Sequence, residues 1–124
     1  MALIELKGVK KRFGDNLVLD NLDLDIKEGE IFGLIGINGS GKTTLLKVLM
    51  GFYKPDDGKI LYKGVDLRKS MSAIRKDFGF TTQENSFYPK LTVLENLNYF
   101  GSLYGLNRKD IENNVSEIMT LLEL

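Results

Sequence analysis

Hydrophobic and polar positions are arranged in two different ways along the first 35 residues. From Ile4 to Phe13 and from Leu22 to Ile26 apolar residues alternate with polar ones, which is typical of strands with one face in water. Ile31–Ile35 is apolar apart from one glycine, which predicts a strand buried on both faces. Together these segments predict an antiparallel β layer joined to a parallel core.

Beyond residue 40 the pattern changes between helices and short strands, so the predicted fold class is α/β. Lys42–Met50 predicts a buried helix, because its apolar residues go most of the way round, and Gly51 is placed to end it. A capping-box pattern over Thr92–Glu95 predicts the start of another helix that runs to about Tyr104. The other predicted elements are strands over 59–62 and 78–82 and a last helix from Asn107.

The sequence stops while its helical pattern is still apolar. Leu121–Leu124 contains no glycine, asparagine or proline that would end a helix. We therefore expect a truncation, in which residues 1–124 form the N-terminal part of a larger domain.

Composition narrows the chemistry that is open to the chain. Its 124 residues carry seventeen basic and seventeen acidic side chains, which argues against nucleic-acid binding through a basic surface. The sequence has no cysteine and no histidine, so disulfides, thiolate or histidine metal sites and serine–histidine hydrolysis are excluded. No apolar run approaches the roughly 20 residues of a membrane-spanning helix.

One segment between a predicted strand and a predicted helix carries a chemical signature. Residues 36–43 fit Gly-x4-Gly-Lys-[Ser/Thr], the pattern of phosphate-binding loops. The glycines let the backbone approach a polyphosphate, and the loop N–H groups and the helix N-terminus stabilise its charge. Lys42 can bridge β- and γ-phosphate oxygens, the Thr43 hydroxyl can coordinate Mg²⁺, and Thr44 can reach the α-phosphate.

Alternative roles for this glycine-rich segment fit the sequence less well. A glycine-rich turn before a core helix would not need the strand–loop–helix order that flanks the motif. Small-molecule kinases and GTPases usually begin with the strand of the loop, whereas roughly 35 residues with two strand patterns precede it here. The Asn-Lys-x-Asp motif of GTPases does not occur in the sequence.

The motifs on either side of the loop resemble those of one family. Lys11-Arg12-Phe13-Gly14, Gly36–Thr44 and Phe80-Thr81-Thr82-Gln83-Glu84 are similar, in order and spacing, to the nucleotide-binding domain of ATP-binding cassette (ABC) proteins. Tyr88–Leu97 looks like the segment that follows the glutamine in that family, and the resemblance runs from Ile4 to Leu124. It implies a P-loop NTPase core with an antiparallel β subdomain, truncated before the helical subdomain is complete.

The resemblance also implies roles for individual residues. Phe13 would stack on adenine in place of the commoner tyrosine, since stacking needs only a ring face. Gln83 would reach Mg²⁺ and the attacking water, while Ile37 replaces a frequent proline whose side chain need not touch phosphate. The implied catalytic residues are Lys42 and Gln83, and the implied metal ligands are Thr43 and Gln83. The implied ATP-binding residues are Phe13, Gly36, Asn38, Gly39, Ser40, Gly41, Lys42, Thr43, Thr44 and Gln83.

The function follows from the same resemblance. The complete protein would be the energising ATPase of an ABC transporter, at the cytoplasmic face of the membrane, with a transmembrane permease subunit and a second ATP-binding domain as partners. Gln83 and the aromatic segment after it are most similar to exporters. The Leu-Ser-Gly-Gly-Gln-type signature, the metal-site aspartate with the catalytic glutamate, and the switch histidine are missing from the 124 residues. We therefore expect Mg-ATP binding with little turnover.

Several alternatives stay open. The chain could be part of a soluble ABC-type ATPase without a membrane partner, or a non-catalytic nucleotide-binding fragment. Lys10–Arg12 predicts a solvated strand face. A group of aromatic residues either docks a membrane subunit or belongs to the core, namely Phe87, Tyr88, Tyr99, Phe100 and Tyr104.

Overall fold

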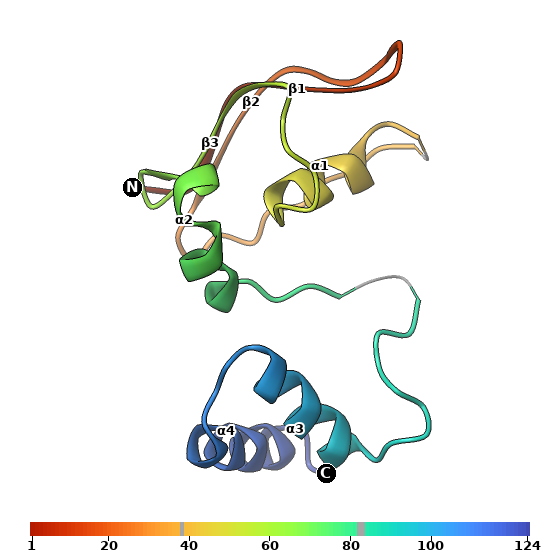
Figure 1. Cartoon of the computed structure of the whole chain (residues 1–124), viewed down its shortest axis with the longest axis vertical. Helices are drawn as coiled ribbons and strands as arrows, with labels where there is room; N and C mark the ends of the chain where they lie inside the picture. Colours follow the sequence, from red (N-terminus) through yellow and green to blue (C-terminus); the bar gives the residue numbers. More distant parts are fainter. Residues whose placement is uncertain (38, 82–83) are drawn as a thin grey trace. The chain divides into compact units, whose positions relative to one another are not determined.

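Two compact units make up the computed structural model, Met1–Phe78 and Gly79–Leu124 (Figure 1). The structure describes residues 1–37, 39–81 and 84–124. Within these residues no helix has the length and apolar character needed to cross a membrane.

A four-stranded antiparallel sheet is the frame of the first unit. Its strands run in the order β2-β1-β3-β4, with bounds Ala2–Phe13 (β1), Asn16–Lys27 (β2), Asp57–Tyr62 (β3) and Val65–Asp66 (β4). Leu6 on β1 pairs with Leu24 on β2 and with Ile60 on β3. The predicted antiparallel layer is therefore confirmed, and its first two strands are longer than their alternating segments.

Helix α1 (Lys42–Leu49) lies against one face of this sheet (Figure 1). Leu45 and Val48 are buried in one cluster with residues of β1, β2 and β3, among them Leu6 and Val9. The prediction of a helix buried most of the way round is wrong, because only one side of α1 meets the sheet and Leu46 remains exposed.

A second helix of the first unit, α2 (Leu67–Ile74), was not expected from the sequence; the short 3-10 helix η1 (Arg75–Asp77) follows it. Asp66 caps α2, since its carboxylate accepts a hydrogen bond from Arg68 N at 2.9 Å. Hydrogen bonds from the Arg68 side chain and backbone stabilise the charged carboxylate and lower the pKa of Asp66 to about 2. The signal in the sequence was present, because Leu67, Met71 and Ile74 follow a capping aspartate at spacings of four and three.

Two predicted strands are absent from the described residues. Ile31–Ile35 has no regular secondary structure, and Ile31 and Ile35 are 99% and 98% exposed. Residues 78–81 are likewise outside any strand, while Thr82 lies outside the described residues. A strand buried on both faces needs neighbouring strands to pair its backbone groups, and none of the described strands pairs with either segment.

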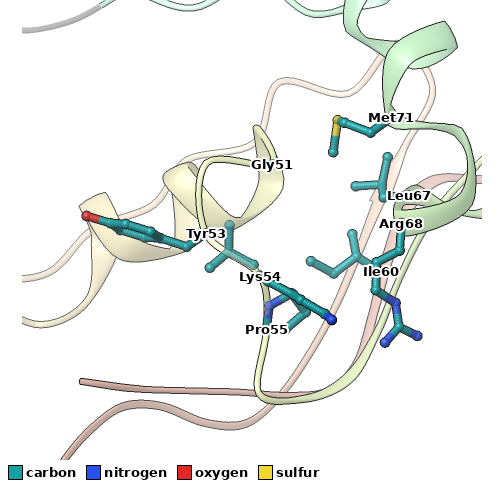
Figure 2. Close-up of a pocket in the computed structure, with 9 residues that line it drawn as sticks. Gly51, Tyr53, Lys54, Pro55, Ile60, Leu67, Arg68 and Met71 are labelled. Atoms are coloured by element: carbon teal, nitrogen blue, oxygen red, sulfur yellow. The ribbon is translucent and has the colours of Figure 1, made fainter. Parts of the chain in front are cut away.

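A cavity of about 380 Å³ lies beside the C-terminal end of α1 (Figure 2). Buried or partly buried apolar side chains line it, among them Ile60, Leu67 and Met71. Lys54 and Arg68 lie at its rim, and Arg68 is bonded to Asp66. Tyr53 borders the cavity, but Figure 2 shows its ring extending away from the other side chains of the lining.

Two helices form the core of the second unit, α3 (Val93–Leu103) and α4 (Arg108–Leu121). The predicted capping box is confirmed: Thr92 accepts from Glu95 N, and the Glu95 carboxylate accepts from Thr92 N. The two helices lie close together at Gly101, where an added Cβ would lie 3.0 Å from Ile111 Cγ1. Asn107 caps α4 as its position predicted.

Three aromatic residues of the second unit form a cluster at α3. The rings of Tyr88, Tyr99 and Phe100 touch one another, with centroids 5.1 Å, 5.5 Å and 6.1 Å apart. Tyr88 and Tyr99 are nevertheless exposed. A role of these rings in docking a membrane subunit stays a prediction.

Candidate nucleotide-binding site

The glycine-rich loop leads directly into α1, as its sequence predicts. Gly39 and Gly41 have φ of 82° and 94°, a region that side chains other than glycine rarely adopt. A Cβ at Gly41 would lie 3.2 Å from both Val18 Cγ1 and Val18 O on β2. Gly41 therefore lets the start of α1 pass close to the sheet, and the contact with Val18 is one that the sequence motif does not reveal.

Lys42 turns back over the loop that precedes it. Its Nζ donates hydrogen bonds to the carbonyl oxygens of Gly36 and Ile37, the second at 2.9 Å. A Cβ at Gly36 would lie 2.5 Å from Ser40 Oγ and 3.5 Å from Lys42 Nζ. The loop is thus closed around the ammonium group, and only a glycine fits at position 36 without a shift of Ser40.

A cavity of about 270 Å³ is bounded by this loop and by β2. Its lining combines the phosphate-loop residues with mostly apolar residues, and consists of Val18, Leu19, Asp20, Leu22, Leu34, Ile35, Gly36, Ser40, Gly41, Lys42 and Leu45. The structure therefore brings four of the predicted site residues to one cavity, namely Gly36, Ser40, Gly41 and Lys42.

The first turn of α1 fits an anion. The N–H groups of the first turn of a helix have no partners within the helix, and the helix dipole places positive charge there. Gly41 has no side chain to cap these groups, and residues 42–45 include no acid. Thr43 and Thr44 lie in this turn, Thr43 exposed and Thr44 half-buried.

The same turn offers little to a free metal ion. No group of three or more acidic side chains lies close together among the described residues, so a cation would need oxygen ligands from elsewhere. Thr43 supplies one hydroxyl, and Mg²⁺ commonly takes one or two protein ligands together with the phosphates of its substrate. The donor set fits Mg²⁺ only when a nucleotide brings phosphate oxygens.

Phe13 ends β1 in the same unit as the loop. The residue is 41% exposed, which leaves surface open to a planar ligand. Tyr53, which the sequence did not single out, touches it. Two predicted site residues, Asn38 and Gln83, lie outside the described residues.

Comparison with known sequences decides the family. The sequence profile of the ABC transporter family matches residues 19–124. The chain belongs to this family. The resemblance of the sequence motifs to the ABC nucleotide-binding domain is therefore confirmed.

Curated relatives of this ABC chain carry names from both directions of transport. The probable multidrug ABC transporter ATP-binding protein YbhF of Escherichia coli is 39% identical over 117 residues, which cover 94% of this chain and 20% of the relative. The Nod factor export ATP-binding protein I of Cupriavidus metallidurans is 35% identical over 123 residues, covering 99% of this chain and 41% of the relative. The Fe(3+) ions import ATP-binding protein FbpC of Photorhabdus laumondii is 37% identical over 121 residues, 98% of this chain and 34% of the relative.

Solved ABC structures share the fold. An ATP-binding subunit of an ABC transporter superposes with a TM-score of 0.80 at 28% identity, over 95% of this chain and 49% of that one. CbiO1 from Clostridium perfringens, part of the ABC transporter complex cbiONQ, superposes with a TM-score of 0.83 at 23% identity, over 96% and 49%. The α/β fold of ABC ATPase type is thereby confirmed, and the chain spans less than half the length of these solved chains and of the curated relatives named above.

Proposed function

We propose that this chain binds Mg-ATP at residues 36–44, with Phe13 against the adenine, as the ATPase subunit of an ABC transporter. The observation that carries the proposal is the position of Lys42. Its ammonium group lies against the carbonyls of Gly36 and Ile37, next to a helix N-terminus that has no acidic residue. A cation and free N–H groups at one point are what a polyphosphate needs.

Each residue of the loop then has a separate task. Lys42 exchanges its two carbonyl partners for β- and γ-phosphate oxygens, and the N–H groups of the first turn of α1 bind further oxygens. Bound Mg²⁺ would neutralise phosphate charge as a Lewis acid, with the Thr43 hydroxyl among its ligands. Gln83 takes the position at the γ-phosphate that the family pattern gives it.

The partners follow from the family. We place the complete protein at the cytoplasmic face of a membrane, bound to a permease subunit and to a second ATP-binding domain. Export is the proposed direction, which agrees with the printed name of the Nod factor export relative, although another relative is named for import. Turnover by residues 1–124 is proposed to be low, because the sequence contains no signature motif, catalytic glutamate motif or histidine.

The test is Mg-ATP binding by calorimetry, together with phosphate release, for the wild type and Lys42→Ala. Loss of a charge-assisted contact is expected to weaken ATP binding about ten- to hundredfold. Lys69→Ala on α2 removes an equally charged, exposed lysine of the same unit and should leave the affinity unchanged. Equal ATP affinity in Lys42→Ala and wild type would refute the site, and Lys42-dependent phosphate release would refute the low turnover.

A further inference from the structure

The ring of Phe13 is held by an aromatic neighbour from a different part of the sequence. Tyr53, in the loop after α1, meets it edge-to-face, with ring centroids 5.2 Å apart and planes at 74°. Lys11 Nζ lies over the Phe13 ring, 5.2 Å from its centroid, and 6.0 Å from the centroid of Tyr53. Both contacts are of kinds that stabilise a defined ring orientation.

Lys11 is part of this support and not of a solvated face. Its side chain is only 14% exposed, and its Nζ lies 3.7 Å from Asp56 Oδ1. Asp56 is itself fixed to β1, because its carboxylate accepts from Arg12 N at 2.6 Å and its N donates to Lys10 O at 2.9 Å. The prediction of a solvated strand over Lys10–Arg12 is therefore wrong for Lys11, since the loop over 53–56 folds onto it.

Tyr53 is tied to α1 as well as to Phe13. Its N donates to Lys47 O at 3.2 Å, and Lys47 Nζ lies 5.5 Å from the centroid of its ring. Figure 2 shows the Tyr53 ring extending away from the cavity at the end of α1. One helix of eight residues thus carries the phosphate loop at its first turn and the support of Phe13 at its last.

We propose that Tyr53 is a positioning residue for the base of the bound nucleotide. Tyr53 holds the Phe13 ring at a fixed distance from the phosphate loop. The base can then bind at Phe13 while the phosphates bind at the loop, and no side chain has to become ordered first. A ring that must be ordered on binding lowers affinity, whereas a ring held in advance does not. This inference rests on the proposed function, in which Phe13 contacts adenine.

The experiment compares two probes that differ in the base. Dissociation constants of Mg-ATP and of inorganic tripolyphosphate are measured for the wild-type chain, Tyr53→Ala, Tyr53→Phe and Phe13→Ala. Tyr53→Ala should weaken ATP binding about two- to tenfold, the range of an aromatic pair, and leave tripolyphosphate binding unchanged. Tyr53→Phe keeps the ring and should restore wild-type ATP affinity.

Phe52→Ala is the matched control. Phe52 precedes Tyr53 in the same loop, is exposed, and has no ring contact with another aromatic of residues 1–37, 39–81 or 84–124, so both affinities should stay at the wild-type value.

Each remaining outcome overturns the inference in a recognisable way. Unchanged ATP affinity in Tyr53→Ala, with Phe13→Ala weakened, would remove the positioning role and leave the nucleotide site intact. A parallel loss of tripolyphosphate binding in Tyr53→Ala would assign Tyr53 to the stability of the first unit. Unchanged ATP affinity in Phe13→Ala would show that Phe13 does not contact the adenine. The proposed adenine contact and the inference would then both be refuted.

Discussion

At the scale of single residues, Asn96 on α3 forms an extensive set of hydrogen bonds within the described part of the second unit. It is buried, its Oδ1 accepts from Tyr88 N at 2.7 Å, and its Nδ2 donates to the carbonyls of Tyr88, Leu91 and Thr92. These bonds fold the segment before α3 onto the helix. A buried amide with this many partners is costly to remove, because each partner group loses its hydrogen bond.

Asn96→Ala is therefore expected to lower the free energy of unfolding of the second unit by about 1–3 kcal/mol, the range for unsatisfied buried polar groups. Urea unfolding followed by far-UV circular dichroism measures it. Asn114→Ala on α4 removes an exposed amide and should change stability by less than about 0.5 kcal/mol. Equal effects of the two substitutions would contradict a structural role of the Asn96 bonds.

Sequence reasoning found residues of one kind and missed those of another. Lys42 and the glycines of its loop were predicted because their task fixes their spacing along the chain. Tyr53 was missed, since it meets Phe13 only where the loop over 53–56 docks on β1. Contacts between segments about 40 residues apart leave no periodic signal.

At the scale of elements, the close pairing of strands β1 and β3 depends on two glycines. The register of the two strands shifts between Lys7 and Lys10, at a bulge that contains Gly8. Gly58 on β3 has φ 84°, and a Cβ there would collide with Gly8 O and come within 2.6 Å of Lys7 O. Backbone atoms cannot rotate away as a side chain can, so this approach is specific to glycine.

Gly58→Ala should therefore lower the free energy of unfolding by about 2–5 kcal/mol. This is the sum of the penalty for a left-handed backbone at alanine and the penalty for overpacking. Gly64→Ala is the control, because Gly64 has φ 79° but no atom within 4 Å of an added Cβ. It should cost only about 1–2 kcal/mol. Thermal unfolding of both variants tests the difference. A Gly58→Ala variant as stable as Gly64→Ala would show that β1 and β3 can move apart with little loss of stability.

Elements were predictable where their signals are local. The capping residues Thr92 and Asn107 stand within one turn of the helices they start, and both helices were found. The apolar run Ile31–Ile35 predicts a strand buried on both faces, but such a strand depends on neighbours that no described strand provides. Helix α2 was missed although Asp66 caps it and Leu67, Met71 and Ile74 recur at helical spacing, because the helix is only eight residues long.

At the scale of the whole molecule, the two units divide the proposed functions. Phe13, Tyr53 and Lys42 all belong to Met1–Phe78, while Gln83 belongs to Gly79–Leu124. Nucleotide affinity is therefore expected to reside in the first unit.

A fragment of residues 1–78 should still bind Mg-ATP, although more weakly than the whole chain. The expected loss is at most about tenfold, since one polar side chain, Gln83, is removed from the proposed site. Calorimetry gives the affinity, and circular dichroism checks that the fragment is folded. A folded fragment that does not bind ATP would place essential contacts in residues 79–124.

The exposure of Ile31 and Ile35 has a consequence for the behaviour of the protein in solution. The formal net charge of the chain is zero at pH 7, so two copies that approach each other experience little mutual repulsion. Burial of the exposed side chains of Ile31 and Ile35 against another copy of the chain then favours association. Sulfate makes this burial more favourable, because it strengthens apolar burial. Solubility should accordingly be lowest in neutral, sulfate-rich buffer and recover when a change of pH gives every molecule the same sign of charge.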